Sequence, residues 1–275
     1  MRRTGHAIAT TSALAASLGL GAHDAVVLQN SNKLTLRLLP GQVLARVAPL
    51  AEPGAVQIAR FELDVAAHLA ASGAPVALPA PGIEPRVHER DGYAVTFWTY
   101  HEPVARPLTP AEYAHALRDL HTGMRGIDLP APHFTDRVAV ALDRLADHAR
   151  TPDLATADRE LLAGALRDGS RAVAESAVPE QFLHGEPHPG NLVTTRDRPL
   201  FVDFETCCRG PVEYDLAHTP DDVAAHYPGA DPRVLNDCRV VMTAMIATWR
   251  WDRDDELPGR DRLRHEWLSR LRRAI

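Results

Sequence analysis

Three oxygen-bearing side chains, Glu186, Asn191 and Asp203, lie close together in the sequence. Two prolines and a glycine between Glu186 and Asn191 exclude a helix there. Further along, Leu192–Thr195 and Leu200–Asp203 are short apolar runs around a polar turn, which predicts a hairpin. That hairpin would bring Asn191 opposite Asp203. A carboxylate and an amide oxygen placed together can hold a hard cation, while Glu186 on a rigid loop addresses a hydroxyl group.

The order of these groups is an acid, four residues, an asparagine, and then an apolar strand that ends in an acid. Kinase-type phosphoryl transfer uses the same order. The sequence resembles the aminoglycoside phosphotransferase and choline kinase family, whose loop reads His-Gly-Asp-x-His-x-x-Asn and corresponds here to residues from His184 to Asn191. Phe201–Glu205 is similar to the metal motif of the family. Asp215, shortly after Gly210-Pro211, matches an acid that braces the loop.

The resemblance implies that the chain transfers the γ-phosphate of ATP to a hydroxyl of a small molecule, with ATP and Mg²⁺ as cofactors. Glu186 would position and deprotonate the hydroxyl. Asn191 and Asp203 would hold Mg²⁺. His184 would brace the loop, and His188 would either support it or face the substrate.

Two residues depart from the family pattern. Glu186 replaces an aspartate and is longer by one methylene group, and a displacement of about 1 Å can lower a rate by about a hundredfold. Arg46 stands where kinase-like folds have a lysine on the third strand, and Glu62 is its expected partner. Arginine binds phosphate bidentately but is bulkier than lysine. Lys33 is a rival cation, and Asn32 in the turn before it could offer a backbone N–H to phosphate.

Several alternatives remain open. Arg46 and Glu62 could form an ordinary pair between a strand and a helix. His184 and His188 could be zinc ligands, although Pro187 excludes helical geometry and no third ligand is evident. The two departures also fit a nucleotide-binding pseudokinase that has lost its activity. A hydrolase is poorly supported, because no G-x-S-x-G nucleophile motif is present.

The elements that must position these residues change in character near His101. Before it, strands predominate around one helix at Ala55–Ala71, and after it the pattern is mostly helical. This order of elements agrees with the resemblance, which implies an α+β, two-lobed, protein-kinase-like fold. It would have a small antiparallel nucleotide-binding lobe (residues 1–101) and a larger helical lobe for catalysis and substrate (residues 102–275). In the family, the segment between the lobes binds adenine, which makes Tyr100 a candidate.

The predicted elements follow apolar periodicity and turn residues. Strands are expected at 26–29, 34–39, 42–47, 84–89 and 93–100, and helices at 12–20, 55–71, 109–122, 136–149, 157–176, 240–251 and 260–273. The apolar, alanine-rich N-terminus also has features of a signal peptide, so that both interpretations stand for it.

The composition limits the classes of partner that the protein can bind. The net charge of −6 argues against a nucleic-acid partner. No segment approaches the roughly 20 apolar residues of a membrane span, so we expect no membrane partner. The sequence has three cysteines, Cys207, Cys208 and Cys238, with no C-x-x-C pair. This odd number favours a location in a reducing cytoplasm.

The acidic residues gather after residue 100, among them the run Asp252–Glu256. An acidic pocket would suit an amino-bearing alcohol as the acceptor, whereas a solvated acidic surface explains the same residues. No pattern in the sequence indicates an oligomeric state.

Overall fold

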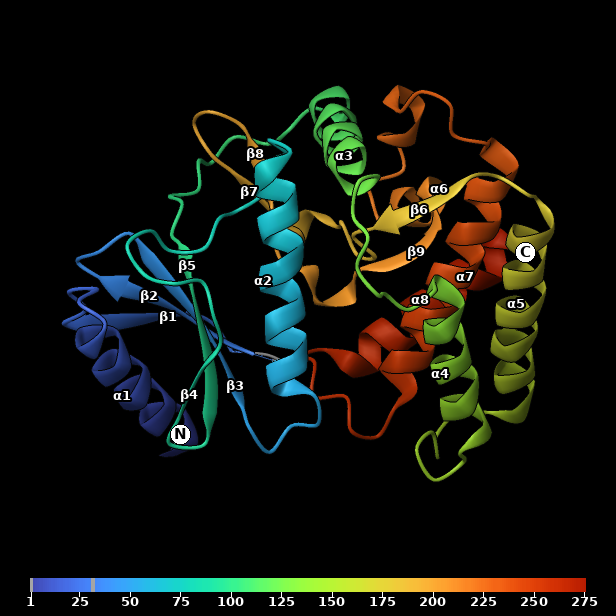
Figure 1. The fold of residues 1–275 in the computed structure, drawn as a ribbon. Helices are drawn as coiled ribbons and strands as arrows, with labels where there is room; N and C mark the ends of the chain where they lie inside the picture. Colours follow the sequence, from blue (N-terminus) through green and yellow to red (C-terminus); the bar gives the residue numbers. More distant parts are fainter. Residues whose placement is uncertain (1, 31–32) are drawn as a thin grey trace. The chain divides into compact units, whose positions relative to one another are not determined.

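The computed structural model describes residues 2–30 and 33–275. Contacts divide the chain into two compact units (Figure 1). The first unit contains residues 1–108 and 190–205, and the second contains residues 109–189 and 206–275. The predicted boundary between residues 101 and 102 concerns functional lobes and stays a prediction.

The first unit is built on an antiparallel sheet with strand order β1-β2-β3-β5-β4. Figure 1 shows its two helices on opposite faces of this sheet. The elements are α1 (Arg2–Ser17), β1 (Asp24–Asn30), β2 (Leu34–Leu39), β3 (Val43–Pro49), α2 (Ala55–Ala71), β4 (His88–Arg90) and β5 (Tyr93–Thr99).

Alternation along the strands gives the sheet one apolar face and one face that carries polar side chains. Leu34, Leu36 and Leu38 of β2 are buried in a core that includes Leu14 and Ala15 of α1. Because successive strand residues point to opposite faces, the residues between these leucines lie on the other face. The sequence predicted a helix at 12–20, whereas α1 spans Arg2–Ser17 and so begins and ends earlier than expected. Because Leu14 and Ala15 pack into this core, α1 is part of the folded unit.

A small hairpin completes the first unit. It consists of β7 (Leu192–Thr194) and β8 (Pro199–Phe201), with Leu192 paired to Phe201. The Phe201 backbone donates to the Pro75 carbonyl at 2.8 Å and accepts from the Ala77 N–H at 3.1 Å. The predicted hairpin is thus present and bonded to the segment that follows α2.

The second unit is mainly helical, and α7 packs against α4, α5, α6 and α8. Its helices are α3 (Pro110–Met124), α4 (Phe134–Ala146), α5 (Thr156–Glu175), α6 (Val212–Ala217), α7 (Pro232–Trp251) and α8 (Arg260–Ala274), and β6 (Glu180–Leu183) pairs with β9 (Cys208–Pro211). Short 3₁₀ turns occupy Pro189–Asn191, Phe204–Thr206 and Ala224–His226.

Two predicted bounds are wrong for local reasons. Helix α7 begins well before residue 240, because the Asp231 side chain accepts from the Arg233 and Val234 N–H groups and caps it. Strand β4 is only three residues long, and the Pro85 in the predicted run has no N–H to donate to a sheet. None of the described helices combines the length and apolar character that crossing a membrane requires.

The packing of α1 can be tested with two neighbouring alanines. Ala15 is fully buried and Ala16 is exposed. We expect Ala15→Asp to lower the free energy of unfolding by about 3 kcal/mol, because it places a carboxylate in the apolar core. Ala16→Asp is the matched control and should leave it nearly unchanged. Equal denaturation midpoints for the two variants, measured by circular dichroism, would contradict this packing.

Candidate active site

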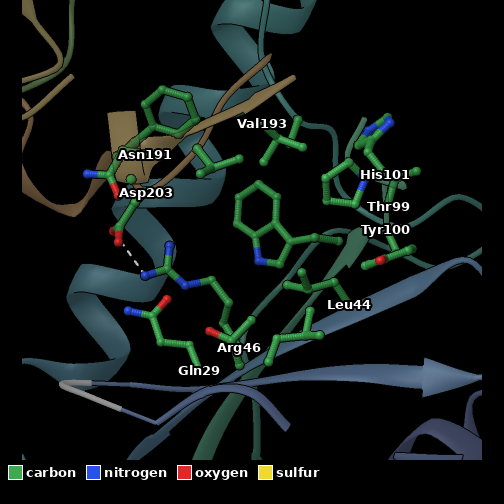
Figure 2. Close-up of a pocket in the computed structure, with 17 residues that line it drawn as sticks. Gln29, Leu44, Arg46, Thr99, Tyr100, His101, Asn191, Val193 and Asp203 are labelled. Carbon is green, nitrogen blue, oxygen red and sulfur yellow. Dashed lines mark hydrogen bonds and ion pairs between the residues drawn. The ribbon is translucent and has the colours of Figure 1, made fainter. Parts of the chain in front are cut away.

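A cavity of about 240 Å³ lies within the first unit, on the face of the sheet opposite α1. Leu44, Trp98, Val193 and Val202 contribute apolar walls. In Figure 2, Arg46, Asn191 and Asp203 gather at one side of the cavity, and the segment after β5 lies at the other. The cavity therefore has an apolar middle and a charged end.

The hairpin brings Asn191 and Asp203 to this charged end. The Val202 N–H donates to the Asn191 carbonyl at 3.0 Å, and both predicted side chains line the cavity. Asp203 has a left-handed backbone (φ 70°), which is uncommon for a residue other than glycine. The register places Asn191 opposite Val202, one residue before Asp203, so both residues lie at the same end of the hairpin, and their predicted role in holding a metal stays a prediction.

Arg46 connects the hairpin to α2. Its Nη1 lies 2.5 Å from Glu62 Oε1, and its Nη2 lies 2.9 Å from Asp203 Oδ1. Burial alone would lower the pKa of Arg46, but Glu62 and Asp203 together raise it above its ordinary value. The predicted pair of Arg46 and Glu62 is confirmed, and the guanidinium stays charged.

Lys33 belongs to the same network. Its Nζ lies 3.0 Å from Glu62 Oε2 and also pairs with Glu205. The sequence named Lys33 as a rival cation to Arg46 and assigned no function to Glu205. The neighbouring candidate Asn32 lies outside the described residues.

The segment after β5 lines the apolar part of the cavity with Thr99, Tyr100 and His101. Tyr100 is fixed on two sides: its N–H donates to the Gln42 carbonyl at 2.9 Å, and the Arg37 guanidinium lies 4.0 Å from its ring centre. Arg37 Nη1 also donates to the Tyr100 hydroxyl at 3.3 Å. Tyr100 is therefore a rigid part of the cavity wall.

The loop that carries the other predicted residues belongs to the second unit, where Asp215 braces it. Asp215 is fully buried and accepts from the His184 N–H at 2.9 Å and the Gly185 N–H at 2.7 Å. His121 Nε2 lies 2.9 Å from the same carboxylate. Gly185 has φ 87°, and a Cβ there would lie 2.1 Å from the Thr206 carbonyl oxygen, so only glycine fits.

Glu186 follows directly and is held by Arg137 of α4, whose Nη2 lies 2.7 Å from Glu186 Oε1. Burial would raise the pKa of Glu186, but Arg137 and, to a smaller extent, His218 hold it below its ordinary value. Burial lowers the pKa of His218 to about 4, so it is neutral near pH 7. Glu186 is therefore a carboxylate with a fixed orientation.

The histidines of the loop have structural contacts. His184 is fully buried, and its Nδ1 accepts from the Glu186 N–H at 3.4 Å. The His188 N–H donates to the Glu186 carbonyl at 2.8 Å. Within residues 2–30 and 33–275, no group of three His, Cys, Asp or Glu side chains is arranged to hold a metal ion.

The predicted residues thus fall into two groups. Arg46, Glu62, Tyr100, Asn191 and Asp203 share the cavity network of the first unit, and His184, Glu186 and His188 form the braced loop of the second. Sequence reasoning missed the Arg137 partner of Glu186, for which the sequence has no signal, because these residues lie 49 positions apart.

Comparisons with known proteins identify the family and the fold. A model of the phosphotransferase enzyme family matches residues 23–237. No match is found among curated proteins.

Solved structures that are similar to the chain include three phosphate-transferring enzymes. The amicoumacin kinase hAmiN, in complex with AMP-PNP, Ca²⁺ and Ami, has a TM-score of 0.69 and 11% identity, with 98% of this chain and 96% of that chain covered. The choline kinase LicA from Streptococcus pneumoniae has a TM-score of 0.69 and 14% identity, with 96% of each chain covered. A spectinomycin phosphotransferase in complex with ADP and spectinomycin has a TM-score of 0.63 and 12% identity, with 96% of this chain and 93% of that chain covered.

At these identities the likeness shows a shared fold. The resemblance found from the motifs and the kinase-like fold predicted from the sequence are confirmed: an antiparallel five-stranded sheet with a helix comes first, and a mainly helical part follows. The sequence predicted a helix near the N-terminus but did not predict that it packs in the core of this sheet, as α1 does.

The ion pair of Arg137 and Glu186 can be tested by titration. We expect Arg137→Gln to raise the pKa of Glu186 above its value in the wild-type chain, because an opposite charge is removed. Carbon-13 NMR of labelled glutamate carboxyl groups, assigned with Glu186→Gln, measures it. Arg167→Gln on the exposed surface of α5 is the control.

The same ion pair makes the stability of the folded chain depend on pH. Because the pKa of Glu186 is lowered in the folded chain, the pair stabilises above the unfolded pKa of about 4.3, and this stabilisation is lost as the pH falls through the folded pKa. Arg137→Gln should weaken that dependence. An unchanged pKa in this variant would contradict the ion pair.

Proposed function

Because the chain belongs to the phosphotransferase enzyme family, we propose that it is a small-molecule kinase that transfers the γ-phosphate of ATP to a hydroxyl group. One observation carries the proposal: Asn191, Asp203 and Arg46 meet at the charged end of a cavity whose remaining walls are largely apolar. An apolar cavity with a few convergent polar groups is a typical small-molecule site.

The nucleotide would lie along this cavity. Leu44 and Val193 offer apolar surface to the base, and the segment from Thr99 to His101 lines the cavity beside it. The Thr99 N–H is already bonded to the Leu78 carbonyl at 2.8 Å, which fixes the segment. Arg46, steered by Glu62, would bind phosphate oxygens through its planar guanidinium.

The residues at the charged end fit Mg²⁺. Asn191 and Asp203 supply the amide and carboxylate oxygens that this ion prefers, and about a third of the Asp203 side chain is exposed. When bound there with the nucleotide, the metal would neutralise phosphate charge. Similar structures in complex with AMP-PNP and Ca²⁺, and with ADP, support these proposed cofactors.

Glu186 is the proposed group for the acceptor hydroxyl. Its Oε1 is bound to Arg137, so its orientation is set before a substrate arrives. A carboxylate with a low pKa is ionised at neutral pH and can accept a hydrogen bond from a hydroxyl and then its proton.

The paired carboxylates of the acidic run near residue 252 do not support an acidic pocket for an amino-bearing acceptor. Asp252 is buried and pairs with Arg144 at 2.9 Å and Arg150 at 2.8 Å, and Asp255 pairs with Arg250 at 3.1 Å. These carboxylates are already neutralised by arginines, so the proposed acceptor is a hydroxyl-bearing small molecule with no charge requirement drawn from this run. The three buried cysteines support the proposed cytoplasmic location.

Asp203→Ala tests the proposed reaction directly. We expect it to lower ATP turnover by about a hundredfold or more, because it removes a carboxylate from the charged end. ADP release, measured with a panel of amino-alcohols, sugars and antibiotics, is the assay. Asp197→Ala in the turn of the same hairpin should retain full activity. Undiminished turnover in a folded Asp203→Ala variant would remove this assignment.

Glu186→Asp separates an active kinase from a pseudokinase. We expect kcat to fall about tenfold to a hundredfold, since the shorter side chain moves its carboxylate away from Arg137. Single-turnover phosphate transfer is the measurement, with circular dichroism as a folding control. A clear rise in activity would instead support a degenerate natural chain.

A further inference from the structure

Lys33 is the single lysine in the sequence, and its side chain is only 11% exposed. A lysine is rarely buried to this degree unless it is paired or used. It directly precedes β2, between Gln29 of β1 and Thr35 of β2, which both line the cavity. Its position in the chain therefore carries its ammonium group to the border of the cavity.

Glu62 connects Lys33 to the charged end of that cavity. Its two carboxylate oxygens bind different cations: Oε1 lies 2.5 Å from Arg46 Nη1, and Oε2 lies 3.0 Å from Lys33 Nζ. In the usual kinase-type site, one lysine on the third strand pairs with one helix glutamate and with the phosphates. Here one glutamate holds two cations, one from β3 and one from the residue that precedes β2.

The donors of the two cations are used differently. Both terminal nitrogens of Arg46 bind carboxylates, one on Glu62 and one on Asp203. Lys33 has three N–H donors and two carboxylate partners, Glu62 and Glu205. An ammonium group on a flexible stem can also exchange the partly exposed Glu205 carboxylate for a phosphate oxygen more easily than a guanidinium held at both ends.

We propose that Lys33 binds a phosphate group of the nucleotide and, together with Arg46, does the work of the lysine that is missing from β3. This inference rests on the proposed function, since it assigns the phosphate ligand of the same cavity. Glu62 then positions both cations, and Glu205 holds Lys33 beside the cavity before the nucleotide binds.

Calorimetry with ADP and adenosine tests the assignment. We expect Lys33→Met to weaken ADP binding about tenfold to a hundredfold, the range for a lost charge-assisted hydrogen bond, and to change adenosine binding less than about twofold. Lys33→Arg should recover part of the ADP affinity. Arg90→Met removes a partly exposed cation from the same sheet and is the matched control, with unchanged affinity for both ligands.

Amine acylation followed by peptide mass spectrometry gives a second measurement. Because Lys33 is the single lysine in the sequence, it is the single side chain that carries an acylatable amine. ADP should protect Lys33, and adenosine should protect it much less. Arg167→Lys adds an exposed reference lysine on α5, whose labelling should not respond to either ligand.

The outcomes separate the two proposals. If the wild-type chain binds ADP but Lys33→Met binds it equally well, or loses ADP and adenosine affinity equally, the phosphate role of Lys33 is wrong and the proposed function stands. If the wild-type chain binds neither ADP nor ATP, both are wrong. Selective loss of ADP binding with ADP-dependent protection supports the assignment.

Discussion

The buried carboxylate of Glu62 is the constraint on which the first unit depends. An ionised group that is 1% exposed is unfavourable by several kcal/mol unless cations and hydrogen bonds surround it. Arg46 and Lys33 supply the cations, so helix α2 is joined to β3 and to the start of β2. Arg46 also pairs with Asp203, which joins the hairpin to the same network. One carboxylate thus fixes the relative positions of helix, sheet and hairpin around the cavity.

The second unit uses the same physical solution at Asp215. This fully buried carboxylate is satisfied by two backbone N–H groups of the loop and by His121. Burial would raise its pKa, but these hydrogen bonds hold the pKa of Asp215 below its ordinary value. A loop without regular secondary structure becomes rigid in this way, and Gly185 makes the close approach to Thr206 possible. Glu186 directly follows Gly185 in this loop, so the position of its backbone is fixed.

Local chemistry explains which parts the sequence could predict. The helix Ala55–Ala71 was predicted with its bounds, because its apolar spacing and the Ser72-Gly73 stop are local signals. The hairpin followed from turn residues in the same way. The start of α1 was missed because alanines give a weak apolar period, although Ala15 is fully buried. The partner of Glu186 could not be predicted, since its contact with Arg137 depends on how α4 packs against the loop, 49 residues further along the chain.

The two departures from the family motif each have a partner outside that motif. Glu186 is longer than the usual aspartate, and Arg137 holds its carboxylate. Arg46 is bulkier than the usual lysine, and Lys33 shares its glutamate. A chain that had merely lost its function would have no reason to satisfy both changed residues with close ion pairs, one of them partly buried and the other formed with the buried Glu62, because an exposed pair adds little stability and a buried one is seldom better than apolar packing. The paired departures therefore argue for an adapted phosphate-transfer site over a degenerate one.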